Sequence, residues 1–212
     1  MTRVSIGLLL LSVLSSSALP SAQQQAMPST GLKRHWRETD SETLWTTRYN
    51  NCDYGYYVLL NVDVVAHDTL PPSPNHGFLV SLSDIGKTTF ASYETEKRYV
   101  WVDAHYDSLD DQSLTGAADA SQKTETVNSA LHHSNRVSTK LAELSAIEDT
   151  LEDSTPKGES FEELIVAVRS GIVYTIGLRT LKAYKAIDEK EFRQIRDGFR
   201  LLRLPKGECS NG

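Results

Sequence analysis

Two apolar segments separated by the dipeptide Ser170-Gly171 constrain the fold of this chain more than any other feature. Residues 161–169 (FEELIVAVR) and 172–180 (IVYTIGLRT) are rich in β-branched residues, as strands are. Ser-Gly between two such runs is typical of a tight β-hairpin. Because both runs are apolar on both faces, they predict neighbouring strands in the middle of a sheet that is covered on its two sides.

Shorter runs of the same kind predict a larger sheet around this hairpin. They are residues 54–66, 78–82, 98–105, 137–141 and 144–151. Residues 36–49 carry isolated Trp and Tyr side chains without a clean period, which indicates a loop or a short strand.

Two helices are expected beside the sheet. The first spans residues 109–131 and begins at a capping box of Ser108 and Asp111. His132 and His133 follow at its C-terminal end, where protonated imidazole suits the helix dipole.

The second predicted helix spans residues 188–200. Asp188 is expected to cap it, with Glu191 completing the box. Phe192, Ile195 and Phe199 line one side of this helix, which predicts that it packs on the sheet.

The C-terminal third, from Val137 onward, resembles the C-terminal half of PsbP-like domains, the family of the photosystem II extrinsic proteins and of Ran-binding nuclear import factors. Tyr174 and Ile176 stand where that family has Tyr-x-Ile in the second strand of the hairpin, and Phe192 and Phe199 stand in its helix. The resemblance implies an α+β fold, a PsbP-like α/β/α sandwich in which helices flank an antiparallel β-sheet. It also implies a family of mostly non-enzymatic binding and assembly proteins, and no site residue. The whole chain also resembles a group of exported bacterial proteins.

The N-terminus predicts export. Arg3 precedes an apolar run at residues 4–14 and then small residues, the layout of a cleavable signal peptide at residues 1–22, cut after Ala18 or Ala22. The run is too short to span a bilayer, and no second long apolar segment predicts a transmembrane helix. We therefore expect a soluble protein of the periplasm or secreted space.

The rest of the chain is expected to comprise a disordered leader and a single domain. Residues 23–31 are rich in Gln, Ser and Pro, and residues 32–212 are long enough to bury a core. The net charge of −6 argues against nucleic acid as a partner.

The chain contains two cysteines, Cys52 and Cys209. An exported chain meets an oxidising compartment, which favours a disulfide between them. The alternative is two unlinked thiols.

Asp103, His105 and Asp107 lie at alternate positions, so in a strand they share a face. Together with His67, they are a candidate site for a divalent metal ion, the only cofactor that the residues indicate. The alternative is the solvated face of an amphipathic strand, with Val100, Val102 and Ala104 on its buried face.

Aromatic residues offer a second candidate site. Tyr54, Tyr56 and Trp101 are candidates for a partner-binding face, because aromatic side chains bring a large contact area with a polar tip. The alternative is that they pack in the core.

These features favour an exported, non-catalytic binding or assembly protein whose partner is a protein or a small molecule. One alternative is a metal-dependent hydrolase that uses the region of Asp103 and His105. A second is an inhibitor or immunity protein against an exported toxin, which the size and acidity of the chain suggest.

Overall fold

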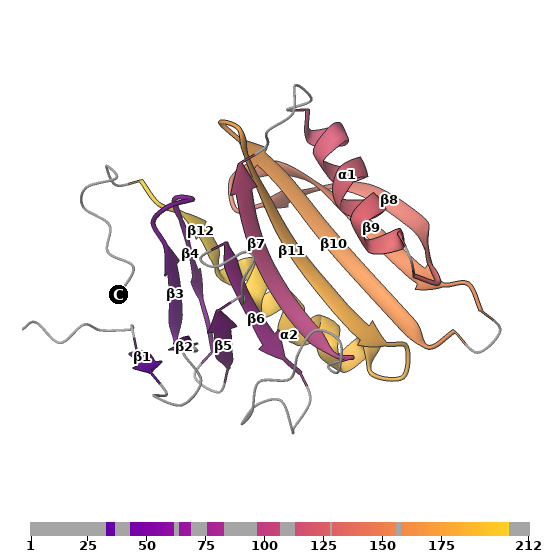
Figure 1. The fold of residues 1–212 in the computed structure, drawn as a ribbon, viewed down its shortest axis with the longest axis horizontal. Coiled ribbons are helices and arrows are strands. Elements are labelled where there is room, and N and C mark those ends of the chain that lie inside the picture. The colour runs from indigo at the N-terminus through magenta and orange to yellow at the C-terminus, as the bar shows by residue number, and fades with distance from the viewer. Residues whose placement is uncertain are drawn as a thin grey trace, which may run out of the picture.

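The computed structural model describes residues 33–36, 43–61, 64–68, 76–82, 97–106, 113–127, 129–155 and 158–203. These residues form a nine-stranded and a three-stranded antiparallel sheet and two helices (Figure 1). The large sheet contains, in spatial order, β1 (Lys33–Trp36), β2 (Thr43–Thr46), β5 (Val65–Asp68), β6 (Gly77–Ser81), β7 (Tyr99–Tyr106), β11 (Ile172–Leu181), β10 (Ser160–Arg169), β9 (Leu144–Asp153) and β8 (Leu131–Leu141). The small sheet has the order β12 (Phe199–Leu201), β4 (Tyr56–Leu59) and β3 (Arg48–Asn51).

The predicted hairpin is β10 and β11, and the prediction is confirmed. Ser170 and Gly171 have φ angles of 52° and 77°, the left-handed conformation of both central residues in a type I′ turn. β10 pairs with β9 on its other side, and β11 pairs with β7. Both strands are therefore interior to the sheet, and most of their residues are buried.

The two faces of the large sheet are covered by different elements. Helix α1 (Leu114–Thr126) lies on one face, over β8, β9 and β10, while helix α2 (Lys185–Gly198) lies on the other (Figure 1). Because side chains alternate along a strand, β7 sends Val100, Val102 and Ala104 into the core shared with α2. Asp103 and His105 project from the face that carries α1, which agrees with the predicted alternation.

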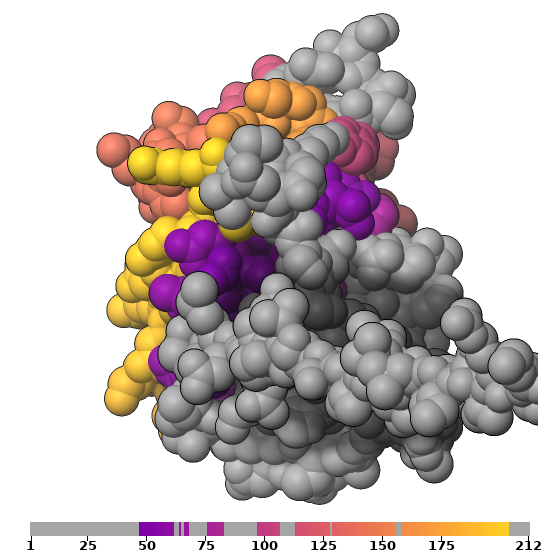
Figure 2. Space-filling view, turned by 90° about the vertical axis from the view of Figure 1, so that its left-hand side faces the viewer, coloured from indigo at the N-terminus to yellow at the C-terminus, as the bar shows by residue number. Residues whose placement is uncertain are grey.

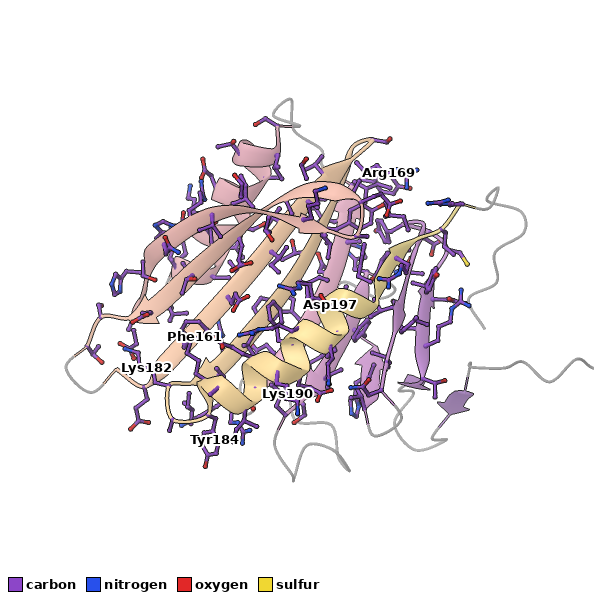
Figure 3. The ribbon with its side chains drawn as sticks, turned by 180° about the vertical axis from the view of Figure 1, so that it is seen from behind. Phe161, Arg169, Lys182, Tyr184, Lys190 and Asp197 are labelled. Carbon is purple, nitrogen blue, oxygen red and sulfur yellow. The ribbon has the colours of Figure 1, made fainter. Side chains whose placement is uncertain are left out.

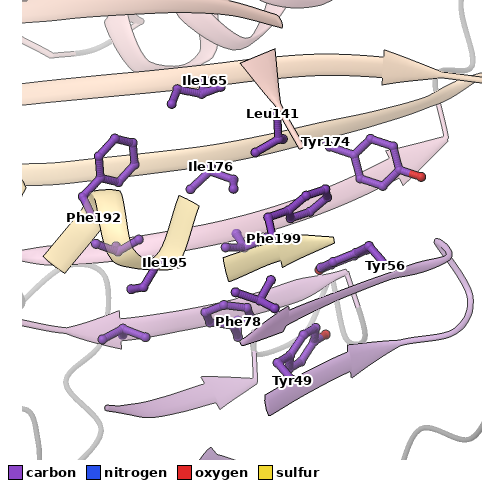
Figure 4. Close-up of a cluster of buried hydrophobic side chains, with 14 of the residues drawn as sticks. Tyr49, Tyr56, Phe78, Leu141, Ile165, Tyr174, Ile176, Phe192, Ile195 and Phe199 are labelled. Atoms are coloured by element: carbon purple, nitrogen blue, oxygen red, sulfur yellow. The ribbon is translucent and has the colours of Figure 1, made fainter. Parts of the chain in front are cut away.

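The main core lies between the large sheet, α2 and the small sheet (Figure 4). Phe192 and Ile195 of α2 and Phe199 of β12 are buried there, as their spacing predicts. The ring of Phe199 stacks on Tyr56 of β4, with centroids 5.2 Å apart. β12 pairs with β4, so the last described strand joins the small sheet to the helix that precedes it.

The predicted N-terminal cap of α2 is wrong. The helix begins at Lys185, its N-cap residue is Tyr184, and no side chain caps it. Asp188 lies buried in the first turn, where it accepts two hydrogen bonds from Arg98, at 2.7 and 2.8 Å, and one from Thr180. Asp188 thus anchors the helix to the sheet.

Helix α1 is shorter than the predicted segment. It begins after Ser113, whose hydroxyl accepts a hydrogen bond from the backbone N–H of Gly116 at 3.0 Å. The predicted capping residues Ser108 and Asp111 lie outside the described residues.

His132 and His133 do not lie at a helix end, because strand β8 begins at Leu131. Nε2 of His133 lies 3.1 Å from the buried carboxylate of Asp149 in β9. The predicted strands at residues 137–141 and 144–151 are confirmed as β8 and β9, both longer than expected.

The signal peptide and leader predicted for residues 1–31 lie outside the described residues, as does Cys209. Within the described ranges, neither helix is long and apolar enough to cross a membrane.

Candidate functional site

A groove of about 720 Å³ runs between the C-terminal part of β8 and the C-terminal end of α2. This volume is within the usual range for ligand-binding clefts. The basic groove, as we call it, is lined by Ser138, Thr139, Lys140, Ala142, Arg196, Asp197 and Arg200.

One wall of the basic groove is the edge of a sheet. Among the residues that the structure describes, β8 is the last strand of the large sheet and pairs with β9 alone. Ser138, Thr139 and Lys140 are consecutive, so their side chains point alternately to the two faces of the sheet. Thr139 shares its face with the buried Leu141 of the main core, whereas Ser138 and Lys140 share the face of Arg136, which contacts α1. Ser138 and Lys140 therefore border the groove from the edge of the strand.

The other wall is the end of α2 and the start of β12. In Figure 3 the helix crosses the back of the sheet, with Asp197 near the end that approaches the β8–β9 hairpin. Arg200 donates from Nη1 to the backbone carbonyls of Asp197 at 2.6 Å and Phe199 at 2.7 Å. Nε of Arg196 donates to Asp197 at 3.0 Å. These bonds fix the two guanidinium groups near the C-terminal end of α2, beside the groove.

The residues that line the basic groove carry a net positive charge. Lys140, Arg196 and Arg200 line it together with a single carboxylate, Asp197. Figure 2 shows the yellow C-terminal segment next to the salmon β8–β9 region at the upper left of that view. In a chain of net charge −6, this concentration of cations favours an anionic partner.

A half-buried carboxylate lies on the sheet beneath α2. Burial and the negative charges of Glu148 and Glu189 raise the pKa of Glu163 to about 7, while Arg196 and Arg193 act in the opposite direction. Arg196 therefore lines the basic groove and also lowers the pKa of Glu163 on the sheet beneath α2.

The predicted metal-site residues are brought together only in part. Nδ1 of His105 lies 3.0 Å from Asp103, and Nδ1 of His76 lies 3.9 Å from the same carboxylate. His67 is buried in β5, and β6 separates it from Asp103 in β7. Asp107 lies outside the described residues.

Asp103 therefore orients the His105 ring at a partly exposed position. Three or more His, Cys, Asp and Glu side chains do not converge as metal ligands anywhere in the described ranges.

The candidate aromatic residues Tyr54, Tyr56 and Trp101 are all buried. The Tyr56 hydroxyl donates to the carbonyl of His76 at 3.0 Å, within the core beside α2. Trp101 belongs to a separate cluster on the opposite face of the sheet. A shared binding face made of these three side chains would therefore require the core to open.

A buried charge cluster on the face under α1 was not predicted. Arg179 of β11 donates to Glu162 of β10 at 2.7 Å and to Glu125 of α1 at 2.8 Å. Burial and the charge of Glu125 raise the pKa of Glu162, against the opposing effect of Arg179. Burial raises the pKa of the neighbouring Tyr99 to about 12.

A second cluster lies on the same face. Arg136 of β8 binds the buried Asp149 at 2.7 and 2.8 Å, and Asp119 of α1 at 2.6 Å. Both clusters hold α1 against the sheet. The sequence alone indicates these clusters only weakly. A charged residue in a strand segment is usually exposed to solvent, so its presence does not predict a buried ion pair.

The groove residues were also missed by sequence reasoning. Lys140 lies in a predicted strand and Arg196 on the polar side of a predicted helix, and each is ordinary in that place. Their proximity follows from β8 being the edge strand and α2 packing on the back of the sheet, and local patterns specify neither.

No family model and no curated protein sequence matches the chain. The solution structure of cyanobacterial PsbP (CyanoP) from Synechocystis sp. PCC 6803 is similar, with a TM-score of 0.50 and 17% identity, over 74% of this chain and 92% of that chain. The Saccharomyces cerevisiae Ran-binding protein Mog1p has a TM-score of 0.47 and 9% identity, over 70% of this chain and 90% of that chain. LpqN, involved in cell envelope biogenesis of Mycobacterium tuberculosis, has a TM-score of 0.35 and 13% identity, over 81% of this chain and 90% of that chain. The likeness to CyanoP shows that this chain has a PsbP-like fold.

Proposed function

We propose that this protein of PsbP-like fold is an exported, non-catalytic binding or assembly protein of the periplasm or secreted space, and that the basic groove holds its partner. The proposal combines the predicted signal peptide with the groove between β8 and α2.

The groove is the observation that carries the proposal. Lys140 lies far in sequence from Arg196 and Arg200, and all three residues line one concave surface. Ligand sites are concave and contain a few convergent polar groups, and the basic groove has both of these features. Cationic residues that line the groove raise the rate of encounter with an anionic partner and set its orientation.

The resemblance to PsbP-like domains also supports a binding role, because that family consists mostly of non-enzymatic binding and assembly proteins. Fold and function are separable, so the resemblance supports the class of function and leaves the partner to the chemistry of the groove.

Site-specific cross-linking in the native host tests the proposal. A photoreactive residue at position 139, in the groove, is expected to cross-link a partner, whereas one at position 123, on the exposed side of α1, is not. N-terminal sequencing of the same exported protein is expected to show cleavage after Ala18 or Ala22.

A charge-matched pair of variants completes the test. Lys140→Gln with Arg196→Gln removes two groove cations and is expected to abolish most of the cross-link. Lys123→Gln with Lys190→Gln removes two exposed cations elsewhere and is expected to leave it unchanged. Equal cross-linking by both double variants, or full retention of the uncleaved chain in the cytoplasm, would contradict the proposal.

A metal-dependent hydrolase remains a second candidate, favoured by the contacts of Asp103 with His105 and His76. Stoichiometric zinc, calcium or manganese in the purified, untagged protein would support it. Its loss in Asp103→Asn would place the metal at this cluster.

A further inference from the structure

We infer that the occupant of the basic groove is an extended acidic segment of a partner protein, which pairs with the outer edge of β8 as an added strand. This inference rests on the proposed function and names the partner's chemistry and its mode of binding.

The first step concerns the backbone of β8. Within the described part of the chain, β8 is hydrogen-bonded on one side only, to β9, although it is eleven residues long. A strand of this kind presents a row of N–H and C=O groups that can pair with another chain. Most of its side chains are exposed, so other elements do not bury the strand.

The second step concerns which part of β8 can accept a strand. The pairing register shifts between His133 and Asn135, an irregularity that interrupts the N-terminal part of the edge. From Asn135 to Leu141 the register is regular. The groove lies beside the end of this regular part, at Ser138, Thr139 and Lys140, and reaches the turn residue Ala142. Three strand residues span about 10 Å.

The third step is the position of α2. A segment that pairs with the edge at Thr139 enters the space between β8 and the end of α2, since both line the same groove. Side chains of an added strand alternate in direction, so every second one points toward Arg196 and Arg200. Backbone pairing then supplies affinity, and the two guanidinium groups select acidic side chains.

The fourth step is the charge of the strand itself. β8 (LHHSNRVSTKL) contains no acidic residue, and Lys140 is exposed on it, whereas the charge of Arg136 is balanced by Asp149 and Asp119. Pairing with β8 of a second copy would bring like charges together across the new ladder, which is destabilising. An acidic segment is complementary to the edge and to the opposite wall, and this argues for a heterologous partner.

Three synthetic peptides test the inference with the mature full-length protein. The first is a fluorescent peptide of alternating Glu and Thr, since Thr favours extended structure. The second carries N-methyl groups on alternate backbone nitrogens, which blocks strand pairing and keeps the charges. The third has Lys in place of Glu. Fluorescence anisotropy measures the affinity of each, and hydrogen exchange follows the amides of residues 138–140.

The first peptide is expected to bind and to protect these amides from exchange. The N-methylated peptide and the Lys peptide are each expected to bind about ten-fold or more weakly. Lys140→Gln with Arg196→Gln is expected to weaken binding of the first peptide by a similar factor. Lys123→Gln with Lys190→Gln, the matched control, is expected to leave it unchanged.

Other outcomes separate the inference from the proposed function. Equal binding of the first and N-methylated peptides would show anion binding without an added strand, which overturns the inference. Absence of peptide binding while position 139 still cross-links a partner in the host also overturns it and leaves the proposed function standing. Dimers by sedimentation that require residues 136–140 would assign the edge to a second copy and overturn it as well.

Discussion

Gly177 illustrates how one residue is specified by a partner far away in sequence. It lies in β11, opposite Trp101 of β7. A Cβ atom built on Gly177 would lie 2.1 Å from Cζ2 of Trp101, and an indole ring buried in a sheet cannot move aside freely. Glycine at this position therefore makes room for the ring.

We expect Gly177→Ala to lower the free energy of unfolding by about 2–3 kcal/mol, because overpacking strains a well-packed core. Urea denaturation followed by circular dichroism measures it. Combining the change with Trp101→Leu is expected to recover part of the loss relative to Gly177→Ala alone. An unchanged midpoint for Gly177→Ala would contradict the packing of this pair.

Glu163 is a residue whose charge works against folding. Its pKa is raised from 4.5 to about 7, first by burial and then by Glu148 and Glu189. The native state thus binds the proton more tightly than the unfolded chain does. The resulting stability is fully present below pH 4.5 and is lost as the pH rises through about 7.

Glu163→Gln is expected to flatten the fall in the free energy of unfolding between pH 4.5 and 7. At pH values above this window the variant is expected to be more stable than the wild type by on the order of 1 kcal/mol, and at pH values below it the two are expected to be alike. Chemical denaturation across this range measures it. Glu143→Gln, at an exposed turn, serves as control and should keep the wild-type profile. If the free energy of unfolding of Glu163→Gln fell with pH as steeply as that of the wild type, Glu163 would not be the group responsible for the fall.

At the scale of elements, α1 and α2 are attached to the sheet by different forces. α2 buries Phe192 and Ile195 in the main core. The buried residues of α1 are Ala117 and Ala118, whose apolar contact is small. Helix α1 depends in addition on ion pairs, of Asp119 with Arg136 and of Glu125 with Arg179.

Because salt screens partly exposed ion pairs, α1 is expected to open more readily at high ionic strength. Raising sodium chloride to about 0.5 M is expected to speed hydrogen exchange at the amides of α1 and to leave those of β10 and β11 almost unchanged. Asp119→Asn is expected to show faster exchange already at low salt, with a smaller response to added salt. Identical exchange of α1 at both salt concentrations would show that charge contributes little to its docking.

At the scale of the whole molecule, the last described strand pairs with a strand from the N-terminal part of the described residues. β12 pairs with β4, and the N–H of Leu202 donates to the carbonyl of Gly55 at 2.8 Å. Cys52 lies three residues before Gly55. The seven residues that follow Leu202, up to Cys209, span at most about 25 Å when extended, so the predicted disulfide is within reach of the chain.

We expect the double variant Cys52→Ala with Cys209→Ala to lower the free energy of unfolding by about 3–5 kcal/mol, because a disulfide restricts the unfolded chain. Urea denaturation with and without reductant measures it, and the double variant should not respond to reductant. Two reactive thiols in denatured, unreduced wild-type protein would contradict the prediction.

The sequence by itself determined the features that depend on near neighbours. The β10–β11 hairpin was predicted because two apolar runs and Ser170-Gly171 specify a tight turn locally. The apolar side of α2 and the alternation of β7 followed from the periods of helix and strand, and the contact of Asp103 with His105 follows from the same alternation. The resemblance in this third of the chain predicted the PsbP-like fold.

Only the tertiary structure decided which distant residues meet. The cap predicted for Asp188 is wrong because the helix begins earlier, at Lys185, and Asp188 pairs instead with Arg98, ninety positions away. Sheet register placed His76, rather than His67, near Asp103. Lys140 and Arg196 form one groove because β8 lies at the sheet edge and α2 crosses the back of the sheet. Strand order and helix docking depend on long-range packing, and local residue patterns carry little information about either.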